Sequence, residues 1–324
     1  MLDILIPGLL PPALSELGLP HLERWLARAD AVREPARSAE GWLAHRFGLE
    51  PAPVAAVSLA VDEAPQPGHW LRADPVFARV ERDSLVLHHA AALGIGADEA
   101  RELVASLRAH FAADGLEFHV PRPDRWYVRV PAGEVPATTA LPEALGQDVF
   151  GRLPRGNGSI NWAGALTEAQ MLLSTHPVNI AREAARKPPV NAIWFWGEGT
   201  LPKEVPARYR NVFASDPFAA GLAHLSGAAL APAPSSPGAI ASEGSVLLVL
   251  DAAAHALNAG NAEEWKAAAL AIDAGWFAEM GGLLKRHGEV RIILPTARDT
   301  CVAALGRGAR WRLLRRPRPL STHA

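Results

Sequence analysis

The segment HPVNIAR (residues 176–182) holds polar residues whose spacing suggests a binding site. If the residues after its proline are helical, Asn179 and Arg182 stand three positions apart and lie on one face. A guanidinium beside an amide can hold an anion by hydrogen bonds. Asn191 and Trp194, in the apolar strand that follows, would line the same pocket. The alternative is that these asparagines bond backbone groups at a domain hinge and that Arg182 pairs with a neighbouring acid or a carbonyl.

A second candidate is the pair Asp251 and His255, which are four residues apart after an apolar run. On a helix the two side chains would face the same way. With a serine nucleophile they would complete a hydrolase triad. The alternative is that Asp251 ends a strand and that His255 lies on a solvated loop.

The C-terminal segment RGARWRLLRRPRP (307–319) contains six arginines and no acidic residue. Such a run can engage phosphates or an anionic membrane surface through charge. It therefore predicts an interaction module as one possible function, and a solvated, mobile terminus as the other reading.

Composition limits the classes of protein that these residues can belong to. The chain has 324 residues, of which 49% are hydrophobic, and a net charge of −2 from 32 basic and 34 acidic residues. This balance excludes wholesale disorder and offers no global field for a polyanion, so a nucleic-acid partner is not expected. The length is enough for two domains or for one large α/β domain with an insertion.

The single cysteine, Cys301, excludes an internal disulfide and a cysteine-based metal cluster. The apolar run 4–14 is interrupted by prolines and follows an aspartate, so it is typical of a buried strand rather than of a signal peptide. No window approaches eighteen uninterrupted apolar residues. We therefore predict a cytoplasmic protein without a membrane span.

Hydrophobic periodicity predicts the elements that must position these residues. Apolar runs of strand length recur between amphipathic helices over the last 130 residues, which favours a doubly wound, mostly parallel sheet. A helix followed by strands in the middle of the chain is typical of an inserted α+β module. We expect a core domain made of residues 1–80 and 186–324, and an inserted α+β cap domain at 81–185.

Several segments, in order, resemble the cofactor-independent phosphoglycerate mutases of the archaeal type, which belong to the alkaline phosphatase superfamily. They are ADPVFAR (73–79), GRLPRGNG (151–158), HPVNIAR (176–182), PVNAIWFWGEG (189–199) and FASDPFAAGLAHLSG (213–227). The resemblance implies an α/β fold with an alkaline-phosphatase-like, doubly wound, mostly parallel sheet that carries an inserted α+β domain. It extends to a divergent bacterial branch of uncertain role.

The chemistry implied by this resemblance is phosphoryl transfer through a serine assisted by two divalent metals, which requires roughly six Asp or His ligands at sheet edges. This chain departs from that pattern. Pro7 stands where the first strand of the family leads into a ligand Asp, Ala254 and Asn258 fall on later ligand positions, and Pro295 with Thr296 replaces an Asp-His pair. We therefore predict no metal and no cofactor.

Ser38 is the remaining candidate for the catalytic residue, because ARSAEGWLAHRFGLEP (36–51) resembles the nucleophile segment of the family. Ala39 follows it in place of the family's Asp, and without a metal or base a serine hydroxyl is a weak nucleophile. The alternative is that Ser38 caps the following helix.

Three functional hypotheses follow. The leading one is a phosphoglycerate-mutase-like pseudoenzyme that has lost two-metal phosphoryl transfer and acts as an anion-binding or regulatory protein, with a small phosphorylated ligand or a protein as partner. The second is an active phosphomutase or phosphatase that uses Ser38 by an altered mechanism. The third is an interaction module that uses the arginine-rich tail.

Overall fold

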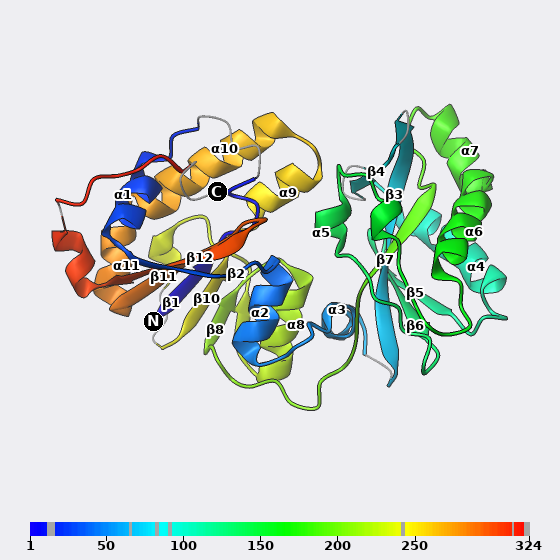
Figure 1. Cartoon of the computed structure of the whole chain (residues 1–324), viewed down its shortest axis with the longest axis horizontal. Helices are drawn as coiled ribbons and strands as arrows, with labels where there is room; N and C mark the ends of the chain where they lie inside the picture. The colour runs from blue at the N-terminus through cyan, green and yellow to red at the C-terminus, as the bar shows by residue number, and fades with distance from the viewer. Residues whose placement is uncertain are drawn as a thin grey trace. The chain divides into compact units, whose positions relative to one another are not determined.

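The chain folds into two compact units, described separately below (Figure 1). The computed structural model describes residues 1–11, 17–64, 67–81, 84–89, 93–240, 244–312 and 314–320. The larger unit comprises Met1–Glu50, Glu204–Leu257 and Asn261–Ala324. The smaller unit comprises Pro51–Lys203 and Asn258–Gly260.

A seven-stranded sheet forms the centre of the larger unit, in the order β2-β12-β11-β1-β10-β8-β9. Its strands are β1 (Leu2–Leu5), β2 (Asp30–Pro35), β8 (Asn211–Phe213), β9 (Ala229–Ala231), β10 (Val246–Val249), β11 (Glu289–Pro295) and β12 (Asp299–Gly306). The pairings from β11 to β9 are all parallel, whereas β12 runs antiparallel to β11 and β2. The sheet is mostly parallel, which confirms the predicted α/β class.

Helices cover both faces of this sheet. They are α1 (Pro20–Arg28), α2 (Ala39–Phe47), α8 (Pro217–Ser226), α9 (Ala252–Asn258), α10 (Ala262–Ile272), a π turn η4 (Asp273–Phe277), α11 (Met280–His287), and the 3₁₀ turns η3 (Pro237–Ala239) and η5 (Arg307–Trp311). Leu2 and Ile4 of β1 join the core beneath α1, α10 and α11. Because side chains alternate along a strand, Asp3 and Leu5 face the other side. There α2 and α8 contact each other.

No single helix among the described residues is long and apolar enough to cross a membrane. The ranges Ala262–Phe277 and Met280–His287 meet that test only as a pair, across a 50° bend. Apart from Leu270, which is exposed, their large apolar side chains, including Trp265, Phe277 and Leu283, are buried in the core of the larger unit. This burial is what packing against a sheet requires of a helix.

The smaller unit contains a five-stranded sheet in which every strand pairing is antiparallel. Its strands are β3 (His69–Glu81), β4 (Ser84–His89), β5 (Glu117–Arg122), β6 (Arg125–Val130) and β7 (Ala192–Thr200). Its helices are α3 (Val54–Asp62), α4 (Ala97–His110), α5 (Leu141–Ala144), the 3₁₀ turn η2 (Phe150–Arg152), α6 (Trp162–Ser174) and α7 (Pro177–Ala184). One core lies between the sheet and the helices α4 and α6, and a second lies beneath α3.

The bounds of the two units differ from the expected 1–80, 81–185 and 186–324. The structure places 51–80 and 186–203 in the smaller unit. The physical reason is strand pairing, because β3 pairs with β6 and with β7 instead of joining the parallel sheet. The helix α3 then packs across β7, where a Cβ on Gly199 would lie 2.6 Å from Cα of Pro53.

Candidate functional site

The carboxyl edge of the larger sheet is the first place to look for chemistry. The strands β1, β10 and β11 are parallel, so the residues that follow them meet at one edge. In open α/β sheets, ligands bind in crevices outside the carboxyl ends of the strands. Here the first polar or loop-forming residues are Pro7 after β1, Asp251 after β10 and Thr296 after β11.

The loop after β1 is closed by packing. Gly8 has a φ of +72°, and a Cβ at this position would lie 2.6 Å from Cα of Ala254 in α9. Its carbonyl oxygen accepts a hydrogen bond of 2.8 Å from the indole nitrogen of Trp265. The glycine therefore permits α9 and α10 to pack directly on the loop, and Pro7 before it offers no side-chain donor.

Asp251 and His255 form an ionisable pair at this edge, since Nε2 of His255 lies 3.7 Å from Oδ2 of Asp251. His255 is in the helix α9, so the alternative expectation of a loop is wrong. Its side chain is 68% exposed. Oδ2 of Asp251 is buried and makes no hydrogen bond within the described part of the chain. The contact is too long for a hydrogen bond, and no described serine hydroxyl is hydrogen-bonded to His255, so the triad is not assembled.

The loop after β11 forms a hydrogen-bonded turn. The hydroxyl of Thr296 donates to the carbonyl oxygen of Asp299 at 3.0 Å and accepts from the backbone nitrogens of Arg298 and Asp299. Asp299 in turn pairs with Arg33 of β2 at 2.6 Å. Thr296 therefore ties the turn between β11 and β12 together.

The side chains at this edge do not fit the two-metal centre that the resemblance implies. Pro7 carries no ligand atom, and Thr296 is engaged in its own turn. Asp251 and His255 supply one carboxylate and one imidazole. Across the residues that the structure describes, no group of three or more His, Cys, Asp or Glu side chains could hold a metal ion.

Ser38, the predicted catalytic candidate, is the N-cap of α2. Its Oγ accepts a hydrogen bond of 3.1 Å from the backbone nitrogen of Gly41, and its backbone is extended with a φ of −64°. An N-cap hydroxyl satisfies one of the free N–H groups of the first helical turn. Among the described residues no base is hydrogen-bonded to Ser38, so the geometry supports the capping role directly.

Asn179 and Arg182, the predicted anion clamp, lie on α7 and are both 1% exposed. The amide of Asn179 donates to the carbonyl oxygens of Leu173 and Val190 at 2.8 and 2.9 Å, and accepts from the backbone nitrogen of Val190 at 2.8 Å. These bonds fasten α7 to the strand that leads into β7.

Arg182 extends this fastening. Its Nε donates to the carbonyl oxygen of Pro188 at 2.9 Å, and its terminal nitrogens bond Glu99, at 2.6 Å, and the carbonyl oxygen of Leu93. The guanidinium thus joins α7 to the start of α4. A buried charge is retained where several acceptors surround it.

Asn191 and Trp194 make similar internal bonds. The Asn191 side chain accepts from the nitrogen of Ala78 at 2.8 Å and donates to its carbonyl oxygen at 2.9 Å, which holds β7 beside β3. The indole nitrogen of Trp194 donates to the carbonyl oxygen of Thr139 at 2.8 Å. The structure therefore brings Asn179 and Asn191 to the same strand entrance. Ser38 belongs to the larger unit, whereas these two asparagines belong to the smaller unit.

A buried polar cluster that the sequence analysis missed lies on the α3 side of the smaller sheet. Arg72, 7% exposed, bonds Oδ1 of Asp74 through Nε at 3.0 Å and through a terminal nitrogen at 2.6 Å. The indole nitrogen of Trp196 donates to the other oxygen of Asp74 at 2.7 Å. The guanidinium lies 5.2 and 5.4 Å from the ring centres of Tyr127 and Trp196. The signal was present, since charges two apart in a strand share a face.

A related pair lies beside it. Arg125 bonds both carboxylate oxygens of Asp62 at 2.6 Å, and the hydroxyl of Tyr127 donates to Asp62 at 2.7 Å. Burial raises the pKa of the Tyr127 hydroxyl well above its usual range, so the phenol stays protonated as a donor. These bonds fix the C-terminal end of α3 to the sheet.

A comparable cluster in the larger unit surrounds Asp3 on β1. This carboxylate is fully buried and accepts hydrogen bonds from Tyr209 and from two nitrogens of Arg291, one of them at 2.7 Å. Arg46 of α2 donates to the Tyr209 hydroxyl at 3.0 Å. Burial raises the pKa of Tyr209 well above its usual range. Asp3 lies near the start of β1, at the opposite end of the strand from Pro7.

The fold and the site together define a two-unit α/β protein with a mostly parallel sheet and no cluster of metal ligands among its described residues. No family model matches the chain. In sequence it is similar to a probable 2,3-bisphosphoglycerate-independent phosphoglycerate mutase of Geobacter sulfurreducens, at 27% identity over 165 residues. A 2,3-bisphosphoglycerate-independent phosphoglycerate mutase of Methanosarcina acetivorans is 29% identical over 163 residues. Each match covers 48% of this chain.

These matches confirm the resemblance to the cofactor-independent phosphoglycerate mutases. The matched segment covers 41% of each of these two curated relatives, which is less than half of their length. Among solved structures, the PH0037 protein of Pyrococcus horikoshii is similar over 97% of this chain and 89% of its own, with a TM-score of 0.54 and 15% identity. A cofactor-independent phosphoglycerate mutase of Thermoplasma acidophilum gives a TM-score of 0.44 at 16% identity. The chain is thus phosphoglycerate-mutase-like in sequence and shares its fold with the Pyrococcus protein.

Proposed function

We propose that this phosphoglycerate-mutase-like chain has lost two-metal phosphoryl transfer and acts by binding a small phosphorylated or otherwise anionic ligand, in a regulatory role. One observation carries the proposal, which is the donor set at the carboxyl edge of the larger sheet. In the order β11, β1 and β10, three adjacent parallel strands lead into Thr296, Pro7 and Asp251, of which only Asp251 carries a carboxylate. Two-metal phosphoryl transfer needs ligands for both cations at one place, because the metals hold the attacking and leaving oxygens.

The position of Ser38 supports the same proposal. Its hydroxyl accepts the N–H of Gly41 and so acts as a helix cap. A hydroxyl becomes an effective nucleophile when an adjacent base or metal removes its proton. The alternative of an active phosphomutase or phosphatase therefore requires Ser38 to react without the help that the family's chemistry uses.

The proposal is tested by metal analysis and turnover on the full chain. After equilibration with Mn²⁺ or Zn²⁺ and gel filtration, we expect well below one equivalent of metal and no mutase or phosphatase activity on 3-phosphoglycerate. Stoichiometric metal together with turnover would contradict the loss of phosphoryl transfer.

Two variants of Ser38 separate chemistry from capping. Ser38→Ala removes the cap and is expected to lower the free energy of unfolding by about 1 kcal/mol, whereas Ser38→Asn keeps a capping oxygen and stays near the wild type. Turnover in the wild type that is lost equally in both variants would assign the hydroxyl a catalytic role. Urea unfolding of the same samples gives the stability comparison.

Ligand binding is tested without substitution. Anion binding by Asn179, Arg182, Asn191 and Trp194 stays a prediction, and their present hydrogen bonds to backbone groups make truncation variants uninformative. We expect 3-phosphoglycerate to bind more tightly than sulfate in a calorimetric titration and to slow amide hydrogen exchange over 176–194. Protection elsewhere would move the ligand site away from this segment, and no difference from sulfate would remove a specific anion.

A further inference from the structure

The arginine-rich C-terminal segment is fastened to the larger unit over its described residues. Ala309 and Leu320, near its two ends, are each 2% exposed and belong to the main core. Arg312 and Arg315 bond the carbonyl oxygens of the last turn of α1 at 3.0 and 2.8 Å. The reading of this segment as a mobile terminus is therefore wrong for the residues described, because its ends are buried and its middle is hydrogen-bonded.

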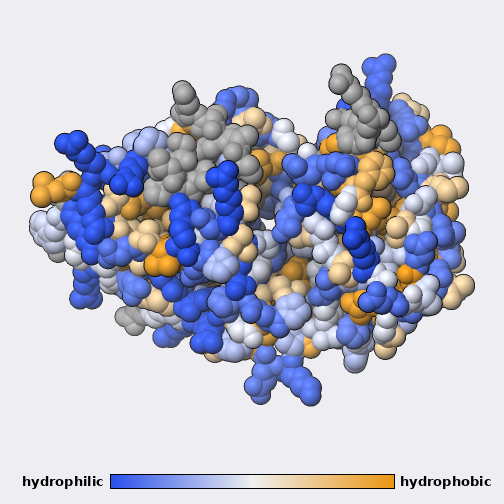
Figure 2. All heavy atoms as spheres, in the orientation of Figure 1, coloured by the Kyte–Doolittle hydropathy of each residue, from blue (hydrophilic) through white to orange (hydrophobic). Residues whose placement is uncertain are grey.

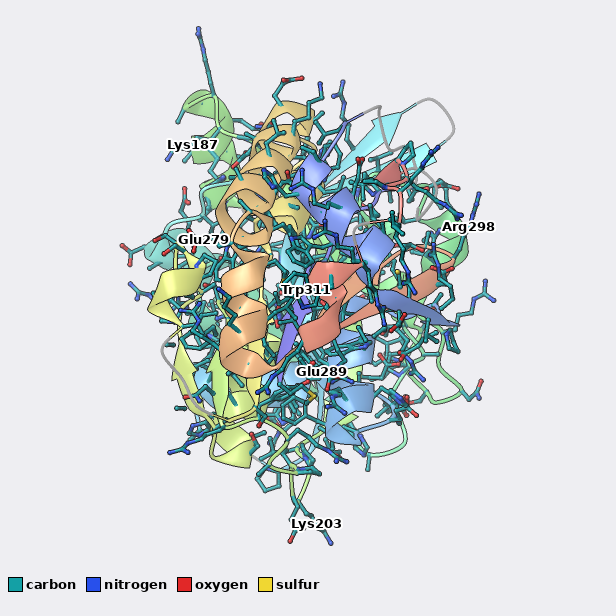
Figure 3. The ribbon with its side chains drawn as sticks, turned by 90° about the vertical axis from the view of Figure 1, so that its left-hand side faces the viewer. Lys187, Lys203, Glu279, Glu289, Arg298 and Trp311 are labelled. Atoms are coloured by element: carbon teal, nitrogen blue, oxygen red, sulfur yellow. The ribbon has the colours of Figure 1, made fainter. Side chains whose placement is uncertain are left out.

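Between these anchors, the segment presents apolar side chains to solvent. Trp311, at the end of η5, is 71% exposed, and Leu314 is 98% exposed. Figure 3 shows Trp311 on the face turned toward the viewer. In Figure 2, apolar groups project among hydrophilic ones at the left-hand end, where Figure 1 places η5. Exposing a tryptophan and a leucine on a fastened segment costs free energy in water.

Positive charge surrounds these two side chains. Arg307, Arg315, Arg316 and Arg318 are exposed, and residues 307–318 contain no acid. Asp30 balances part of this charge, since it pairs with Arg312 at 2.7 Å and with Arg315 at 3.3 Å. A hydrogen bond from Arg312 holds the pKa of Asp30 below its usual range. Arg316 and Arg318 make no hydrogen bond or ion pair with the residues that the structure describes.

We propose that this segment docks the larger unit on an anionic lipid bilayer, with Trp311 and Leu314 at the headgroup boundary and the surrounding arginines on acidic headgroups. Tryptophan is favoured at this depth because its ring is amphipathic, and leucine gains by leaving water for the acyl region. The charge supplies attraction to the anionic surface.

Leu314 favours a bilayer over nucleic acid. A single-stranded nucleic acid also binds arginines and stacks its bases on tryptophan. An aliphatic side chain that is 98% exposed gains neither stacking nor a hydrogen bond from such a partner. A bilayer uses all three kinds of side chain, so it is the occupant that the observations fit.

The proposal is tested by co-sedimentation of the full chain with vesicles of phosphatidylcholine alone and of phosphatidylcholine with phosphatidylserine. We expect binding to the second kind only, reduced by added salt. The double variant Arg316→Gln/Arg318→Gln is expected to weaken partitioning roughly 30-fold, since each arginine near the surface contributes roughly fivefold. Equal binding to both kinds of vesicle, or binding to neither, would overturn the proposal.

A matched control uses Lys203→Gln/Arg298→Gln, which removes the same charge from two exposed residues outside the segment. Lys203 belongs to the smaller unit, and Arg298 precedes β12 whereas Arg307 follows it. We expect this variant to partition like the wild type. An equal loss in both double variants would show that net charge alone decides binding.

The apolar contribution has its own readout. Lipids brominated in their acyl chains should quench part of the tryptophan fluorescence of the wild type, and this quenching should disappear in Trp311→Phe. Leu314→Ser should weaken vesicle binding without changing thermal unfolding, because the side chain is exposed. Tight binding to single-stranded RNA that survives Leu314→Ser, without vesicle binding, would assign the segment to nucleic acid instead.

Discussion

The carboxyl edge of the larger sheet and the α3-facing side of the smaller sheet differ in how closely their ionisable side chains are paired. At the edge, three parallel strands lead into Pro7, Asp251 and Thr296, and the contact between His255 and Asp251 is 3.7 Å long. On the smaller sheet, Arg72 and Asp74 are almost fully buried and bond each other at 2.6 Å.

This difference shows that the chain stabilises the smaller sheet with a buried ion pair and does not do so at the carboxyl edge of the larger sheet. The pair on the smaller sheet lies on β3, and its carboxylate accepts hydrogen bonds from Arg72 and from Trp196 of β7, so it ties the two strands together. At the edge, Oδ2 of Asp251 has no hydrogen-bond partner among the described residues. If Arg72 and Asp74 stabilise the fold, breaking their pair should lower the free energy of unfolding strongly. If Asp251 contributes little to stability, its removal should lower that free energy only slightly.

The largest expected effect is therefore the loss of Asp74. Asp74→Ala leaves the Arg72 guanidinium buried and uncompensated, and we expect the free energy of unfolding to fall by about 3–5 kcal/mol in urea titrations. Asp251→Ala should cost less than about 1 kcal/mol, because it removes a buried oxygen that makes no hydrogen bond within the described part of the chain. Equal losses from the two substitutions would remove the contrast between the regions.

Glu117→Ala is the matched control for this comparison. It breaks the pair with Arg129, which is as short, at 2.6 Å, but leaves a carboxylate position that is 53% exposed. Because exposed pairs are screened by water, we expect a loss of about 0–1 kcal/mol. If this loss matched that of Asp74→Ala, burial would not be the reason for the cost.

A middle-sized effect tests whether the edge is closed by packing. Gly8→Ala puts a Cβ 2.6 Å from Cα of Ala254 at a φ of +72°, so we expect a loss of about 2–3 kcal/mol from strain and overpacking. Gly48 has nearly the same φ, +74°, with no atom within 4 Å of its Cβ position. Gly48→Ala should therefore cost only about 1 kcal/mol in the same unfolding assay. Equal costs would show that α9 yields readily and that the edge can open.

Much of the larger unit could be predicted from the sequence because its signals are local. The apolar run that became β1, and the alternation of strands and helices in the last part of the chain, each reflect burial within a few residues. The sequence allows two roles for Ser38, catalysis and helix capping. The capping hydrogen bond joins residues only three apart, Ser38 and Gly41, so local spacing is enough to predict it.

The placement of 51–80 and 186–203 could not be predicted because it depends on strand partners far apart in the chain. Trp70 of β3 pairs with Arg129 of β6 and with Gly199 of β7. Nothing local to those residues specifies that pairing. Separation along the chain also explains why the hydrogen bonds of Arg182 could not be predicted. Its acceptors include Glu99 and Leu93, which are more than eighty residues away in sequence.

The smallest effect concerns His176, the N-cap of α7. This residue belongs to the smaller unit, as the buried ion pair on the smaller sheet does. Its Nδ1 accepts the N–H of Val178 and its Nε2 contacts the Ser106 hydroxyl at 3.0 Å, and burial lowers its pKa below the usual value. A lowered pKa in the folded state means that the unfolded chain binds the proton more readily, so stability should fall as the pH drops below the ordinary histidine value of about 6.5. His176→Asn keeps a capping group without a titrating proton and should remove ~0.5 kcal/mol or less of the difference between pH 8 and pH 5, because the ring is partly solvated. An unchanged pH dependence in this variant would assign the effect to His287, whose pKa burial also lowers and which lies in the larger unit.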